Sequence, residues 1–262
     1  MARVLAISSH VVRGHVGLSA AVPALQWLGH EVWTLPTVLL ASRPGLGRFV
    51  RHELPLLDLG AMLTALEADG CWATIDAVLT GYFPSAGSVK AVAEAVARIK
   101  QTKPGISVLV DPILGDAGQL YINGQTAAAI RDCLLPLATI ATPNLFELQW
   151  LTGAKSPDLD AAKAAQTLGP PIVAVTSARE IKERIFTLLI TSTASTERSA
   201  TRRRGIPNGP GDVFSGLLLG HLLNGQSTLA AFDASLADLD RVLAASENEP
   251  VLKLSALSAR HA

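Results

Sequence analysis

The amino-acid sequence predicts an α/β protein with a doubly wound, mostly parallel sheet and helices on both faces. Residues 4–8 and 106–110 are continuous apolar stretches, as expected of strands that are covered on both sides. Residues 86–101 carry apolar side chains at helical spacing along one face. Because strands alternate with helices for most of the chain and the connections are short, a parallel sheet is the expected arrangement.

Residues that end helices and strands divide the first half of the chain. Gly29 follows the first expected helix, Pro104 follows the third, and Asp111 with Pro112 ends the fourth strand. Pro23 lies inside the first helix and should kink it or shift its start. The expected strands are 4–8, 31–40, 76–80 and 106–110, and the expected helices are 16–28, 56–68 and 86–101.

The second half continues this alternation. Residues 193–205 are polar, basic and poor in apolar side chains, so we expect a mobile loop or an edge hairpin there. The chain shows no linker and no internal repeat, which predicts one domain over residues 1–262. The other expected elements are helices over 125–134, 145–151, 160–168 and 228–245, a helix that begins near Asp212, and strands over 139–141, 172–175 and 185–191.

Composition excludes several classes of function. The chain has 22 Lys and Arg against 22 Asp and Glu, so nothing global indicates a nucleic-acid or acidic-membrane partner. Cys71 and Cys133 form neither a metal-site spacing nor a disulfide framework, which indicates a reducing compartment. The apolar run at the N-terminus is too short for a signal peptide, and no run approaches the length of a membrane span. We therefore expect a cytoplasmic protein.

The most informative motif is Gly209-Pro210-Gly211-Asp212, which directly precedes an apolar helical run. Glycines allow an anion to approach the backbone, and the free N–H groups and dipole of a helix N-terminus favour a phosphate. A carboxylate beside a phosphate suits a general base that takes a proton from an attacking hydroxyl. The alternative is a turn in which Asp212 only caps the helix.

Polar residues follow most of the expected strands. Since the carboxyl ends of parallel strands share one edge, these residues should meet the glycine motif in one crevice. Structural alternatives stay open: Asn144 and Glu147 match a capping box, Asp111 and Pro112 can simply end a strand, and Tyr82 can be a half-buried aromatic. The residues concerned are Ser9, His10, Tyr82, Asp111, Asp116, Thr142, Asn144, Thr176 and Ser177.

Several known site motifs are absent from the sequence. The chain has no phosphate-binding loop of the Gly-x-x-x-x-Gly-Lys-Ser/Thr type and no Gly-x-Ser-x-Gly elbow. The Gly45-Leu46-Gly47 stretch does not continue as a dinucleotide fingerprint. His10 and His15 lack the spacing of a zinc site, so we interpret them as structural or solvated histidines.

Five segments together resemble pyridoxal kinases of the ribokinase superfamily, in that family's order along the chain. They are residues 8–17 (SSHVVRGHVG), 79–82 (LTGY), 111–116 (DPILGD), 142–148 (TPNLFEL) and 209–212 (GPGD). The first segment is the one most specific to pyridoxal kinases, and the last is shared by the wider superfamily. The resemblance implies a ribokinase-like fold and ATP-dependent phosphorylation of the 5′-hydroxyl of pyridoxal, and of pyridoxine and pyridoxamine.

The resemblance also implies roles for individual residues. Asp212 would be the catalytic base, and the amides of Gly209 and Gly211 would stabilise the transferring phosphoryl group. Asp111, Asp116 and Glu147 would organise Mg²⁺ and its waters, with Asp116 and Glu147 as metal ligands. Arg198 and residues 202–204 would form a flap over the nucleotide. The substrate ring would lie among Ser9, Pro44, Gly45, Tyr82 and Asp212, and ATP among Asp111, Tyr121, Thr142, Glu147, Thr176, Ser177, Gly209, Pro210 and Gly211.

The resemblance further implies a homodimer, and it leaves a monovalent-ion requirement open. Two departures from the family pattern concern rate and substrate range. Arg43-Pro44-Gly45 replaces a His-Thr-Gly or His-Thr-Gln loop, and Pro210 cannot donate an N–H. Two other functions stay open: a hydroxymethylpyrimidine kinase of the same superfamily, and a vitamin-B6-binding protein without catalysis.

Overall fold

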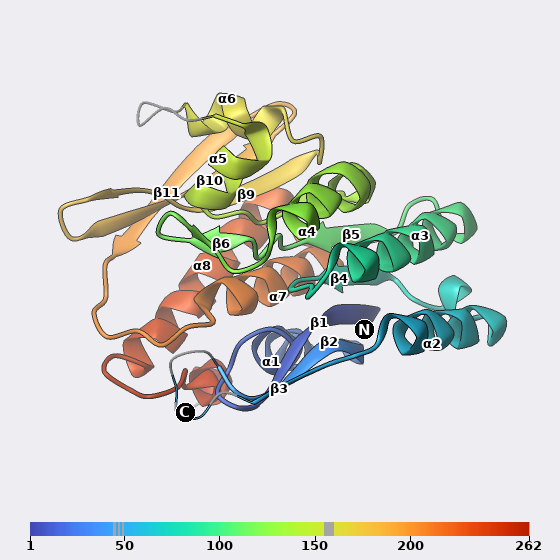
Figure 1. Cartoon of the computed structure of the whole chain (residues 1–262). Helices are drawn as coiled ribbons and strands as arrows, with labels where there is room; N and C mark the ends of the chain where they lie inside the picture. The colour runs from blue at the N-terminus through green and yellow to red at the C-terminus, as the bar shows by residue number, and fades with distance from the viewer. Residues whose placement is uncertain (44–45, 47, 49, 155–159, 262) are drawn as a thin grey trace.

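A computed structural model of the chain describes all residues except 44, 45, 47, 49, 155–159 and 262, and it describes side chains up to residue 258. Its main feature is a nine-stranded sheet with the order β11-β10-β9-β8-β5-β4-β1-β2-β3 (Figure 1). The strands are β1 (Arg3–Arg13), β2 (Glu31–Ser42), β3 (Arg51–Glu53), β4 (Ala77–Thr80), β5 (Ser107–Val110), β8 (Ile140–Ala141), β9 (Ile172–Ile181), β10 (Arg184–Thr191) and β11 (Ser195–Thr201).

The six central strands from β9 to β2 pair in parallel, and β3, β10 and β11 add antiparallel edges. A separate two-stranded hairpin consists of β6 (Gly115–Asp116) and β7 (Gln119–Leu120). Strand order changes direction at β1, whose neighbours are β2 on one side and β4 on the other. In open α/β sheets, ligands bind beside such a switch point. The predicted fold class is confirmed.

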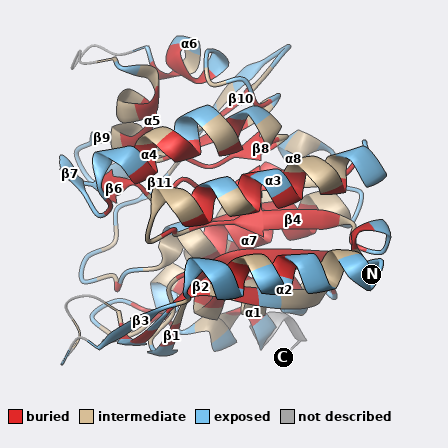
Figure 2. Ribbon diagram, turned by 45° about the vertical axis from the view of Figure 1, so that its right-hand side comes forward, coloured by how far each residue is buried: buried red, intermediate tan, exposed pale blue. Residues whose placement is uncertain are grey.

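Helices cover both faces of the sheet (Figure 1). Alternate strand residues point to opposite faces, so Ile7 and Val110 pack in one core cluster, while Ala6 and Leu109 pack in another. The outer surfaces of the helices are exposed and the central strands are buried (Figure 2). The helices of one face are α2 (Leu56–Ala68), α3 (Ala86–Thr102), α4 (Gly124–Ala129), α5 (Leu145–Thr152) and α6 (Ala161–Gln166), and those of the other are α1 (Leu18–Trp27), α7 (Pro210–Leu223) and α8 (Thr228–Ala245).

Proline inside α1 has a visible consequence. Pro23 stands in the helix interior, where it has no N–H for the carbonyl of Ser19 four residues earlier. His15 Nδ1 lies 3.0 Å from that carbonyl oxygen and donates in its place. This supports the structural interpretation of His15. The helix starts at Leu18 because Gly17 has φ 56° and ψ −133°, a conformation outside the helical region.

Two strands run further than the sequence indicates. The pairing of β1 with β4 ends at Ile7 and Thr80, but β1 continues beside β2 as far as Arg13 and Ser42. Ser9 therefore lies within β1 and not after it. The short β3 pairs with β2, and the three strands together project beyond the rest of the sheet. We call the projecting parts of β1, β2 and β3 the wall.

The other correction concerns Thr176 and Ser177, which lie inside β9 and not after it. The pairing of β9 with β10 shifts register here, and Ser177 has φ 48°. The strand then continues to Ile181. Residues 193–205, expected as a mobile loop or an edge hairpin, contain the edge strand β11. Within the described part of the chain, no helix is both long and apolar enough to cross a bilayer.

Candidate active site

The ends of the central strands bring the candidate residues into one row. Ile7, Thr80, Val110 and Ala141 are in register across β1, β4, β5 and β8. The next residue of each strand continues the ladder: Gly81 N donates to Ile7 O at 2.9 Å, Asp111 N to Thr80 O at 2.9 Å, and Thr142 N to Val110 O at 3.2 Å. As expected, Asp111 and Thr142 therefore lie side by side at the carboxyl edge.

Helix α7 begins at this edge, with Gly209 as its N-cap. Gly209 has φ 116°, and a Cβ at this position would lie 1.8 Å from His15 O, so the fold itself requires glycine there. Pro210 is the first helical residue, a position where proline is favoured because its N–H has no intrahelical partner. Asp212 stands in the first turn, so the alternative in which it is the N-cap of this helix is wrong.

Gly211 has a different status. It is exposed, its φ is ordinary, and among the described residues a Cβ would meet no atom within 4 Å. Glycine inside a helix costs roughly 0.5–1 kcal/mol relative to alanine. Since the protein's own packing does not need glycine here, the missing side chain leaves the helix N-terminus open to a ligand.

The carboxylate of Asp212 is half-buried and points back to the loop before α1. Burial raises its pKa from an ordinary 3.8 to about 6. The N–H of Gly17 hydrogen-bonds to the carboxylate and acts in the opposite direction. Gly17 packs closely against Ser9, because a Cβ on Gly17 would lie 2.3 Å from Ser9 Oγ. The arrangement holds Asp212 in place with a basicity suited to accepting a proton near neutral pH.

A buried hydroxyl relay connects α7 to the strand ends. Ser215 Oγ donates to Asp111 Oδ2 at 2.9 Å and lies 2.8 Å from Thr142 Oγ1. Burial is the largest cause that raises the pKa of Asp111 well above its usual range, followed by the charges of Asp212 and Glu147. Asp111 thus lies close enough to both Asp212 and Glu147 to be affected by their charges.

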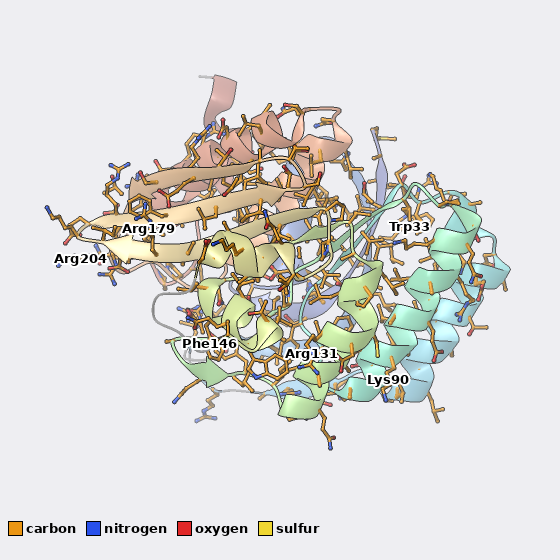
Figure 3. The ribbon with its side chains drawn as sticks, turned by 90° about the horizontal axis from the view of Figure 1, so that it is seen from above. Trp33, Lys90, Arg131, Phe146, Arg179 and Arg204 are labelled. Atoms are coloured by element: carbon orange, nitrogen blue, oxygen red, sulfur yellow. The ribbon has the colours of Figure 1, made fainter. Side chains whose placement is uncertain are left out.

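Glu147 forms the capping box with Asn144, and it does more. Its carboxylate accepts from the N–H of Asn144 and of Leu114, each at 2.8 Å, and Gly115 N lies 3.5 Å away. Burial raises the pKa of Glu147 to about 7 despite these bonds. A Cβ on Gly115 would lie 2.8 Å from Phe146 (Figure 3), so this turn fits tightly against α5.

The β6–β7 hairpin places two further candidates beside Glu147. Asp116 is exposed and accepts from Ala117 N at 2.7 Å. Tyr121 is 58% exposed, and Tyr121 N donates to Leu114 O at 2.7 Å. Burial of its hydroxyl, then the charges of Asp116 and Glu147, raise the pKa of Tyr121. The hairpin therefore adds a carboxylate and a phenol beside Glu147.

The wall extends beyond the row of strand ends, on the β1 and β2 side of the sheet. Register pairs Ser9 with Val38 and Val11 with Leu40, so these four side chains share one face. Tyr82 packs against this apolar face. Its backbone is fixed at both ends, because Tyr82 N donates to Ser8 Oγ at 2.9 Å and Thr37 Oγ1 donates to Tyr82 O at 2.7 Å. Pro44 and Gly45, also predicted to contact the substrate, lie outside the described residues.

The two candidates on β9 differ in their relation to this cluster. Thr176 joins it through its backbone, since Thr176 N donates to Pro143 O at 2.9 Å, whereas Ser177 is exposed on the bulge of β9.

The predicted arginine flap forms ion pairs with acidic side chains of the protein: Arg198 with Asp233, Arg202 with Glu180, Arg203 with Asp240 and Glu247, and Arg204 with Glu183. Arg179 and Arg204 lie at the projecting end of strands β9, β10 and β11 (Figure 3). Covering a nucleotide would require these contacts to open.

Comparison with known proteins gives the family. The model of a family described as phosphomethylpyrimidine kinase matches residues 17–249. A pyridoxal kinase from Corynebacterium diphtheriae is 34% identical over 255 residues, which cover 90% of this chain and 87% of that protein. The chain belongs to the pyridoxal kinase family. The resemblance noted in the sequence is thereby confirmed.

Solved structures of pyridoxal kinases share the fold. The enzyme from Entamoeba histolytica matches with a TM-score of 0.92 at 27% identity, covering 100% of this chain and 96% of that one. A pyridoxal kinase from Leishmania donovani in complex with ADP and pyridoxamine matches with a TM-score of 0.87 at 27% identity, covering 99% and 94%. The ribokinase-like fold is therefore shared over nearly the whole length of both kinases.

The carboxyl groups suit Mg²⁺ better than a transition metal. The described residues contain no group of three His, Cys, Asp or Glu side chains that would enclose a metal. Mg²⁺ in a kinase normally keeps several waters and takes one or two carboxylates plus substrate phosphates. Asp111, Asp116 and Glu147 are the side chains that would hold Mg²⁺, since they offer oxygen ligands of this kind and the charge of Glu147 already acts on Asp111.

Three residues that contact this site were not predicted from the sequence. Ser215 lies one turn after Asp212 on α7, so helical spacing was an available signal. Gly17 and Arg51 reach the site only through tertiary contacts with Asp212 and with Tyr82. Nothing in the local sequence indicates those contacts.

Proposed function

We propose that this protein is an ATP-dependent pyridoxal kinase that phosphorylates the 5′-hydroxyl of pyridoxal, and also accepts pyridoxine and pyridoxamine. The observation that carries the proposal is the carboxylate of Asp212, which is held beside the open N-terminus of α7 with its pKa raised to about 6 by burial. The family relationship supports it, as does the pyridoxal kinase fold that binds ADP and pyridoxamine in a relative.

In this mechanism Asp212 accepts the proton of the attacking hydroxyl. A pKa near 6 leaves the carboxylate ionised at neutral pH and still basic enough to take the proton. The amides of Gly211 and Asp212 lie at the helix N-terminus and stabilise negative charge on the transferring phosphoryl group. Pro210 supplies no amide N–H, but proline is favoured at the first position of a helix, so α7 still forms. Pro210 therefore tunes the rate and does not abolish the reaction.

The remaining residues bind the two substrates. The wall, with Ser9 and Tyr82, holds the pyridine ring, and Pro44 and Gly45 are further candidates on that side. Thr142, Tyr121, Thr176 and Ser177 line the nucleotide side. Asp111, Asp116 and Glu147 would hold Mg²⁺, which neutralises phosphate charge when it is bound.

Several finer statements belong to the same proposal. One domain over 1–262 is supported by the single large sheet. A homodimer is supported by exposed apolar side chains on the outer face of the wall, where Val12 is 82%, Leu39 46% and Val50 63% exposed. A cytoplasmic location is supported by two free cysteines and by the need for ATP. Arg198 and residues 202–204 stay a candidate nucleotide flap.

A substrate panel tests the function. Release of ADP is measured with pyridoxal, pyridoxine, pyridoxamine and hydroxymethylpyrimidine, with Mg²⁺ and ATP present. Turnover that depends on the three B6 compounds supports the proposal. Turnover with the pyrimidine alone would support the hydroxymethylpyrimidine kinase, which the description of the matching family model favours. Tight binding of pyridoxal without turnover would support the binding protein.

A further inference from the structure

Strand β3 places one cation on the inner face of the wall. Register pairs Arg51 with Leu40 and Glu53 with Val38. Because paired residues share a face of the sheet, Arg51 and Glu53 lie on the same face as Leu40 and Val38, against which Tyr82 packs. His52 pairs with Leu39 and therefore lies on the outer face.

The contacts of Arg51 show where its guanidinium stands. Its Cζ lies 5.9 Å from the centroid of the Tyr82 ring, and the guanidinium forms an ion pair with Glu53. In the pair Arg179 and Phe186 the same distance is 4.2 Å. Arg51 thus stands over Tyr82 at the outer limit of a cation–π contact, with its side chain 32% exposed. The fork has five N–H donors, so the ion pair leaves donors for another anion.

Arg51 is the cation of this face that contacts Tyr82. Of the other side chains paired along it, Arg13 near the end of β1 is a second cation, Glu53 is negative, and Ser9, Val11, Val38, Leu40 and Ser42 are uncharged. An exposed ion pair of this kind contributes little to stability. Charge on an edge strand also discourages unwanted pairing, but that protection works equally well from the outer face. The inward direction of Arg51 calls for another reason.

The chemistry of the substrate provides one. A 3-hydroxypyridine readily loses the proton of its ring hydroxyl while the ring nitrogen is protonated, which leaves a ring oxide. A guanidinium forms charge-assisted hydrogen bonds with such an oxygen. An aminopyrimidine with the same hydroxymethyl group has no ring oxide. We propose that Arg51 is a specificity-determining residue that pairs with the ring oxide of 3-hydroxypyridine substrates, while Tyr82 contacts the ring; this rests on the proposed function.

Removal of the oxide from the ligand and of the cation from the protein tests the pairing. The ligands are pyridoxine and 3-deoxypyridoxine, which lacks only the ring hydroxyl. The variants are Arg51→Gln, Glu53→Gln and, as a matched control on another antiparallel strand, Arg184→Gln. Dissociation constants are measured by calorimetry without nucleotide, and KM and kcat by ADP release.

Arg51→Gln should weaken binding of pyridoxine roughly 5- to 20-fold, as for a charge-assisted hydrogen bond at a partly exposed site. It should leave binding of 3-deoxypyridoxine and kcat nearly unchanged. Glu53→Gln frees the cation and should keep or tighten pyridoxine binding, and Arg184→Gln should change nothing.

Equal losses for both ligands would overturn the inference, because Arg51 would then act through packing alone. Equal losses in Arg51→Gln and Glu53→Gln would also overturn it, because the ion pair would matter only for the structure of the wall. If the wild-type protein binds pyridoxine and does not phosphorylate it, the proposed function fails, and the binding constants still decide the role of Arg51.

Discussion

Replacement of Asp212 by Asn should slow catalysis and stabilise the fold. The wild-type carboxyl has a pKa of about 6 in the folded protein against about 3.8 when solvated. Each pH unit of that difference corresponds to about 1.4 kcal/mol, so ionisation of Asp212 costs the folded state roughly 3 kcal/mol at most. Partial exposure to solvent reduces this to roughly 1–3 kcal/mol. Asn has the same shape and no charge, so the variant escapes the cost.

The pH dependence fixes the sign of this effect. A carboxyl whose pKa is raised on folding stabilises the protein below the unfolded pKa, near 4, and this contribution is lost as pH rises towards 6. Asp212→Asn should therefore have a larger free energy of unfolding than wild type. This difference should develop between pH 4 and 6 and stay constant above pH 6. Urea denaturation at several pH values measures it, and kcat should fall roughly 10²–10⁴-fold. Near-normal turnover with normal pyridoxal binding, or no stability gain at pH 7.5, would refute the reasoning.

Three further predictions follow from the same site. In wild type, kcat/KM should fall about tenfold per unit below pH 6 as Asp212 takes up a proton, and a profile flat down to pH 5 would contradict this. Gly211→Ala should raise the free energy of unfolding by roughly 0.5–1 kcal/mol and raise the KM for ATP, because its methyl group meets the ligand and not the protein; unchanged ATP kinetics would place the phosphates elsewhere. Pro210→Thr restores an N–H and should raise kcat with little change in pyridoxal affinity, measured by steady-state kinetics and calorimetry; if it leaves an inactive protein inactive, the binding-protein function becomes the better one.

The fold was largely predictable because apolar strands buried on both faces and amphipathic helices leave clear patterns. Errors arose where tertiary pairing decides the length of an element. Nothing in residues 9–13 distinguishes the end of β1 from its continuation, since the extra pairs come from β2, and β2 is in turn extended by β3. Thr176 and Ser177 resemble a strand end because the bulge of β9 interrupts the apolar pattern there.

The site was predictable as a list of residues but not as a network. Strand ends and the glycine motif indicate Asp111, Thr142 and Asp212, yet only the structure shows that Ser215 connects two of them. The sequence could not separate the two glycines of the motif either. Gly209 is required by contact with His15, whereas Gly211 faces open space. The same applies to Glu147, which is a helix cap and a buried acid at once.

Formation of pyridoxal 5′-phosphate by the purified protein tests the central claim most directly. The protein is incubated with ATP, Mg²⁺ and pyridoxal, and ADP and the phosphorylated product are quantified together by mass spectrometry, with Asp212→Asn as the matched control. We predict one pyridoxal 5′-phosphate per ADP in wild type and roughly 10²–10⁴-fold less in the variant. Pyridoxal that binds to wild type but yields no phosphorylated product, or equal product from both proteins, would contradict the assignment of Asp212 as the base of a pyridoxal kinase.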